Sequence, residues 1–78
     1  MRTDEAIAEL TKHLAKRPFR PFRVVLTNGE TLDVVRQFQL GFGVAQFGVA
    51  PPKRGAFIHR RLDQILEVSS LDSANALS

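Results

Sequence analysis

The residues of this chain that could do chemistry are mostly cations, and they gather in two groups. The first group contains Lys16, Arg17, Arg20 and Arg23. The second group contains Lys53, Arg54, His59, Arg60 and Arg61. Clustered arginine and lysine side chains bind phosphates and acidic protein surfaces. The competing interpretation is ordinary solvated surface, and the sequence alone does not show whether the two groups meet on one face.

Other chemistry has little support in the sequence. The two histidines, His13 and His59, lie far apart in the chain, and there is no cysteine. His59 and Asp63 could form a base and its orienting carboxylate, but a spacing of four residues brings side chains together only in a helix. The segment around Gly41 and Gly43 lacks the strand-turn-helix context of a nucleotide loop. We therefore predict no enzyme activity, no cofactor and no metal site.

Composition predicts one small intracellular domain. The chain has 78 residues, 44% of them hydrophobic, and a formal net charge of +3. Its sequence pI is about 10.2. No apolar run approaches the roughly 20 residues that a membrane span needs, and the lack of disulfides favours the cytoplasm over secretion. We expect a single domain over residues 1–71, a polar tail over 72–78, a cytoplasmic location and no membrane contact.

The N-terminal segment predicts a helix over residues 4–16. Thr3 is the expected cap, with acidic residues in the first turn where the helix dipole favours them. Ile7, Leu10 and Leu14 form an apolar stripe at helical spacing. Pro18 then ends the helix, because proline disfavours helical backbone at the preceding residue.

A repeated basic-Pro-Phe unit connects this helix to a hairpin signal. Phe19 and Phe22 are expected to fill the seam between helix and sheet, with base stacking as the less favoured alternative. From Phe22 the chain alternates apolar and polar residues, and Asn28-Gly29 follows. That pair predicts a type I′ turn, with a returning strand over residues 30–38 that carries Leu32 and Val34 on one face and Asp33 and Val35 on the other.

The rest of the chain predicts short strands and turns. We expect a turn over residues 39–43, strands over 44–50 and 56–60, a tight turn over 61–64 and a last strand over 65–69. Gly48 marks a bend or a close approach, and Pro51 to Gly55 reads as a loop. Val24, Leu26, Ile58 and Ile65 are the expected core. The predicted fold is mainly β: an N-terminal helix, then a strongly bent antiparallel sheet of four or five strands, or a small open barrel.

This order of elements, with the hairpin sequence FRVVLTNGETL, resembles the Sm-like family, especially its bacterial Hfq branch. The resemblance covers roughly residues 5–70 and implies subunits that join edge to edge into RNA-binding rings. It places Arg60 where the Hfq branch has an RNA-contacting histidine, with His59 at the preceding lysine. The chain departs from the family at Val34, where a bend glycine is expected. The RPFxPFR block also resembles a set of small bacterial proteins to which no activity is attached.

Two functions follow as hypotheses. The first is an oligomeric, RNA-chaperone-like nucleic-acid-binding module, with its subunits joined through edge strands. Its predicted site residues are His59, Arg60, Arg61, Lys53, Arg54, Arg17 and Arg20. The second is a small scaffold or protein-interaction domain whose strand edges pair with a partner, such as an acidic protein, and whose cations only maintain solubility. The expected edges are residues 44–50 and 65–69.

Overall fold

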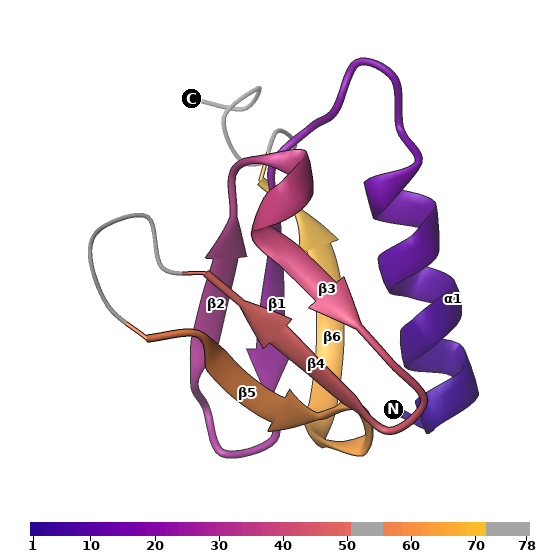
Figure 1. The fold of residues 1–78 in the computed structure, drawn as a ribbon. Coiled ribbons are helices and arrows are strands. Elements are labelled where there is room, and N and C mark those ends of the chain that lie inside the picture. Colours follow the sequence, from indigo (N-terminus) through magenta and orange to yellow (C-terminus); the bar gives the residue numbers. More distant parts are fainter. Residues whose placement is uncertain (51–55, 72–78) are drawn as a thin grey trace.

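The structure, a computed structural model, describes residues 1–50 and 56–71. The predicted loop at Pro51 to Gly55, with the candidate residues Lys53 and Arg54, and the predicted tail at 72–78 lie outside the described residues. Within the described part, one helix and six strands follow one another (Figure 1). They are α1 (Thr3–Leu14), β1 (Phe22–Leu26), β2 (Thr31–Val34), β3 (Leu40–Phe42), β4 (Gln46–Val49), β5 (Ile58–Arg61) and β6 (Ile65–Ser70). Two 3₁₀ turns, η1 (Gln37–Gln39) and η2 (Leu62–Gln64), separate β2 from β3 and β5 from β6.

Helix α1 forms where it was predicted, with different ends and a rotated buried face. Arg2 rather than Thr3 is the cap residue, and its backbone N–H donates to Glu5 Oε1 (3.3 Å). The last helical residue is Leu14, two residues before the predicted end. The face turned to the core carries Ala6, Leu10 and His13, while Ile7 and Leu14 flank it half-buried. Figure 1 shows α1 along one side of the strands, where it packs on η2 and β6.

The predicted hairpin is confirmed, but its turn is of another type. β1 and β2 pair antiparallel with Val24 opposite Leu32. Val24 is buried as expected, and Leu32 is buried beside it. Leu26 accepts a hydrogen bond from the Gly29 N–H (3.0 Å) and donates its own N–H to the Glu30 carbonyl (2.8 Å). Gly29 has φ +90°, and no described non-glycine residue has positive φ. A three-residue loop with a left-handed glycine therefore replaces the type I′ turn, which would need Asn28 at positive φ as well.

The returning strand is shorter than predicted, because Gln39 redirects the chain. Its Oε1 accepts hydrogen bonds from the backbone N–H groups of Val35 (2.9 Å) and Arg36 (3.3 Å). Its Nε2 donates to the carbonyls of Asp33 (3.3 Å) and Ala50 (2.6 Å). The buried amide of Gln39 thus forms hydrogen bonds with backbone groups at the end of β2, where the strand stops and η1 begins. The predicted strand to residue 38 and the predicted turn over 39–43 are wrong, since residues 40–42 form β3.

The strands form two three-stranded antiparallel sheets rather than one bent sheet. The first sheet has the order β2-β1-β6, and the second has the order β3-β4-β5. The fold is therefore a small, mainly β domain whose two sheets do not close into a single barrel. β6 is an edge strand, as predicted. β4 lies between β3 and β5, so the prediction that residues 44–50 form an edge is wrong.

The core fills the space between the sheets and α1. Val24, Leu26 and Ile65 are buried as predicted, whereas Ile58 is only half-buried at its margin. Phe22 is fully buried and fills the seam under the helix, with its ring centroid 5.0 Å from that of His13. Phe19 packs edge-on against Phe22 and stays half-buried. Core packing, rather than base stacking, is therefore the role of Phe22.

Candidate interaction surface

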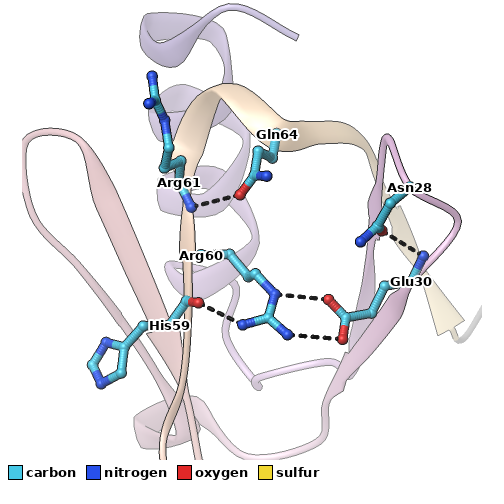
Figure 2. A network of polar contacts seen from close by, with 6 residues as sticks. All are labelled: Asn28, Glu30, His59, Arg60, Arg61 and Gln64. Atoms are coloured by element: carbon cyan, nitrogen blue, oxygen red, sulfur yellow. Dashed lines mark hydrogen bonds and ion pairs between the residues drawn. The ribbon is translucent and has the colours of Figure 1, made fainter.

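Arg60, the central residue of the predicted nucleic-acid site, is held by a carboxylate of its own chain. Its Nε and Nη2 donate to the two carboxylate oxygens of Glu30, at 2.8 and 3.0 Å (Figure 2). Both side chains are about one-third exposed. The hydrogen bonds from Arg60 lower the pKa of Glu30, so the pair is fully ionised at neutral pH. This two-pronged contact ties β5 of the second sheet to the hairpin of the first.

Arg61 and Arg23 are paired in the same way. Arg61 donates to both oxygens of Asp63 (3.1 and 2.6 Å), and these bonds lower the pKa of Asp63. Arg23 donates to both oxygens of Asp33 (2.7 and 3.2 Å), its cross-strand neighbour. Each pair carries no net charge. Their contribution to a long-range positive potential is therefore small, which weakens the case for a phosphate-binding face.

The two predicted basic groups are not brought together. Arg17 and Arg20 are exposed on the connector between α1 and β1. Figure 1 shows that connector at one end of the molecule and the end of β5, with Arg60 and Arg61, at the other. The expectation of a second basic rim beside His59, Arg60 and Arg61 therefore has no geometric support among the described residues.

The two histidines lie in different environments in the part of the chain that the structure describes. His13 is buried against Phe22, whereas His59 lies on the surface of the second sheet. No cluster of three or more metal-ligating His, Cys, Asp or Glu side chains occurs among residues 1–50 and 56–71. None of the helices in these same ranges is both long enough and apolar enough to cross a membrane.

A shallow hollow on the outer face of the second sheet is the site that sequence reasoning missed. It measures about 560 Å³. Gly41, Gly48 and His59 are cross-strand neighbours and share this outer face, while Phe47 and Val49 point into the core. We call it the glycine hollow. Its lining is Gly41, Phe42, Gly43, Val44, Ala45, Gln46, Phe47, Gly48, Phe57 and His59.

The floor of the glycine hollow is bare backbone. A Cβ built on Gly41 or Gly43 would meet nothing within 4 Å. A Cβ on Gly48 would lie 3.0 Å from Phe57 Cδ1 and 3.3 Å from His59 Nδ1, so these rings rest directly on the strand. The predicted close approach at Gly48 is therefore confirmed. The spacing of Gly41, Gly43 and Gly48 is the signal in the sequence for this site, but glycines at such a spacing equally predict a turn and a bend.

The walls of the glycine hollow are apolar and exposed. Val44 is 90% exposed and Phe57 is 52% exposed. The rings of Phe57 and His59 lie 5.7 Å apart at an angle of 31°. Among the residues that the structure describes, no Asp, Glu, Lys or Arg lines the hollow, and Figure 2 shows the His59 ring directed away from the Arg60–Glu30 pair. The hollow thus offers apolar and aromatic contact without a fixed charge.

Comparison with known proteins adds no family to this geometry: no family model, no curated protein and no solved structure matches the chain.

Proposed function

We propose that this protein is a small protein-interaction domain whose glycine hollow receives apolar side chains of a protein partner. The observation on which the proposal depends is that exposed apolar side chains, Val44 and Phe57, lie around a surface of glycine backbone with open space above it. Exposed apolar surface is costly in water, and burying it contributes roughly 25 cal/mol per Å². Aromatic side chains in such places are the common anchors of protein interfaces.

The size of the hollow favours a short segment of the partner. Binding pockets for small groups measure about 300 to 1,000 Å³, and the glycine hollow lies within that range. A stable dimer between broad faces buries roughly 800 Å² on each partner, far more than three strands of three or four residues present. The described lining carries no charge and favours neutral apolar side chains, so an acidic partner would place its carboxylates outside this part of the hollow.

Nucleic-acid binding is the second candidate, and one observation favours it. The exposed rings of Phe57 and His59 could stack on a base, which single-strand-binding surfaces do. Affinity for nucleic acid comes mainly from phosphate neutralisation, however. Arg60 and Arg61 beside these rings are already engaged by Glu30 and Asp63. We therefore rank this function below protein binding.

The Sm-like fold also remains a proposal. The chain order of the strands supports it: β1 pairs with both β2 and β6, and the other three strands form a meander. If β2 and β3 are the two halves of one strand interrupted by η1, five strands follow the helix, as the resemblance implies. Assembly into a ring is a separate question, because it needs strand edges that are free to pair.

The test uses Gly41→Val, which fills the floor of the hollow without straining the chain. Gly41 lies in a strand, at ordinary negative φ, with open space above it, and valine is a strong strand former. A photo-reactive phenylalanine at position 57 would first capture the partner in cells. After purification of that partner, we expect Gly41→Val to weaken its binding at least about tenfold, a loss of about 1.4 kcal/mol.

Leu66→Ser is the matched control, because Leu66 is an exposed apolar residue on β6 outside the hollow. It should leave the affinity for the purified partner unchanged. Two results would contradict the proposal. One is a partner whose binding Gly41→Val does not alter. The other is a nucleic acid as the molecule captured at position 57, which would place RNA or DNA binding first.

A further inference from the structure

Within residues 1–50 and 56–71, the second sheet has an unpaired edge along β5, because β5 pairs with β4 on one side only. The Leu62 N–H donates to the Ala45 carbonyl (2.8 Å), so the main-chain groups of Leu62, and by alternation those of Arg60, face β4. The main-chain groups of His59 and Arg61 therefore face the opposite edge. An added strand of either direction would have to bond to these groups.

Two side chains of the same protein already occupy groups on this edge. Arg60 Nη1 donates to the His59 carbonyl (2.6 Å), and Gln64 Oε1 accepts the Arg61 N–H (3.1 Å) (Figure 2). The His59 carbonyl and the Arg61 N–H are the two groups that one residue of an added parallel strand would use together. An added antiparallel strand would likewise need the His59 carbonyl. Both modes of pairing are therefore obstructed.

Glu30 fixes the Arg60 side chain in the obstructing position. It binds Nε and Nη2, which leaves Nη1 directed at the His59 carbonyl. Glu30 is itself fixed by the hairpin turn, because its N–H donates to Asn28 Oδ1 (2.9 Å) and its carbonyl accepts the Leu26 N–H. The obstruction thus depends on a chain of contacts from the turn of the first sheet to the edge of the second.

We infer that Arg60 and Gln64, with Glu30 as the anchor of Arg60, guard the β5 edge against a strand of a second copy of this chain. Unpaired edges invite strand addition, and folded proteins block it with charged or inward-turned side chains. The need for a guard is clear here, because Phe57 and His59 place exposed rings next to this edge. The guard concerns the strand edge, and it does not depend on what the glycine hollow binds.

The experiment measures the mass in solution by light scattering over a wide range of protein concentration. The wild type should stay at its monomer mass, 8.7 kDa. Arg60→Ala frees the His59 carbonyl, so this variant should reach at least twice the monomer mass at concentrations where the wild type does not. Gln64→Ala, which frees the Arg61 N–H, should shift the mass in the same direction.

Two further variants separate edge pairing from simple loss of charge or misfolding. Arg61→Ala removes the same charge but leaves both guarding contacts in place, so it should remain a monomer. His59→Pro in the Arg60→Ala background removes an outward N–H and blocks strand addition, so it should restore the monomer. The inference is overturned if Arg60→Ala remains a monomer, if the proline does not restore the monomer, or if the wild type is already an oligomer.

Discussion

At the scale of single residues, His13 is a buried ionisable side chain that the fold keeps neutral. It is 5% exposed, and its Nδ1 is buried without a hydrogen-bond partner among the described residues. Burial lowers the pKa of His13 below its usual 6.5, and Lys16 and Lys12 lower it further, against an opposing effect of Glu9. Its ring lies against Phe22, which offers no charge. The folded state therefore holds a neutral imidazole.

This arrangement predicts a pH dependence of stability with a definite sign. Because the unfolded chain protonates His13 near pH 6.5 and the folded chain only at lower pH, acid favours unfolding. The contribution of His13 to the free energy of unfolding should be fully present well above pH 6.5 and be lost as the pH falls below that value. Chemical denaturation at a series of pH values measures it.

His13→Leu should flatten that fall, since leucine fills the site without binding a proton. His59→Gln, which removes the exposed histidine, should leave the fall in place. A His13→Leu variant with the same pH dependence as the wild type would show that other groups are responsible.

At the scale of elements, the features that depend on local sequence pattern could be predicted. The features that depend on contacts between distant side chains could not. The alternation from Phe22 to Leu26 gave the correct buried face, because period two is a property of any strand. Asn28-Gly29 gave the hairpin but not its turn, since glycine at positive φ suits both a type I′ turn and a three-residue loop. The break after β2 was not predictable, because it depends on a bond from Gln39 to Ala50, eleven residues away.

Gln39 is therefore the residue on which the step from β2 to β3 depends. Gln39→Met keeps the length of the side chain but removes four hydrogen bonds and leaves the Ala50 and Asp33 carbonyls without the amide. We expect a loss of about 2 kcal/mol or more, because unsatisfied buried polar groups each cost about 1 to 3 kcal/mol.

Thermal unfolding followed by circular dichroism measures this loss. Gln37→Met is the control, because Gln37 makes a single side-chain bond in the same turn, to the Leu14 carbonyl. It should cost less than half as much. Equal losses for the two variants would mean that Gln39 does not hold the break between the strands.

At the scale of the whole molecule, the candidate site was predictable only in part. The second basic group was visible in the sequence, and Asp63 was close enough to Arg61 to suggest an ion pair. The Arg60–Glu30 pair was not visible, since it joins residues thirty positions apart on different sheets. The glycine hollow depends on β3 and β4 lying side by side, which required the break at η1 to be known.

The formal net charge of +3 already counts the paired carboxylates, so pairing leaves it unchanged and weakens only the argument from the clustered arginines. Arg23, Arg60 and Arg61 are each matched by a carboxylate within the fold. The strand edge that a ring would use at β5 is occupied by Arg60 and Gln64. These contacts agree with the proposal that the β5 edge is guarded against strand addition.

The most direct test of this account is binding of labelled single-stranded RNA and DNA, followed by fluorescence anisotropy at about 50 mM salt, where phosphate contacts are strong. The chain contains no Trp or Tyr, so a purified sample also reveals bound nucleic acid by its ultraviolet absorbance. We predict no saturable binding by the wild type and no nucleobase absorbance. Saturable binding that weakens steeply with salt and is lost in Arg61→Ala would contradict the account, because it would show that the arginines of β5 serve phosphate rather than the fold.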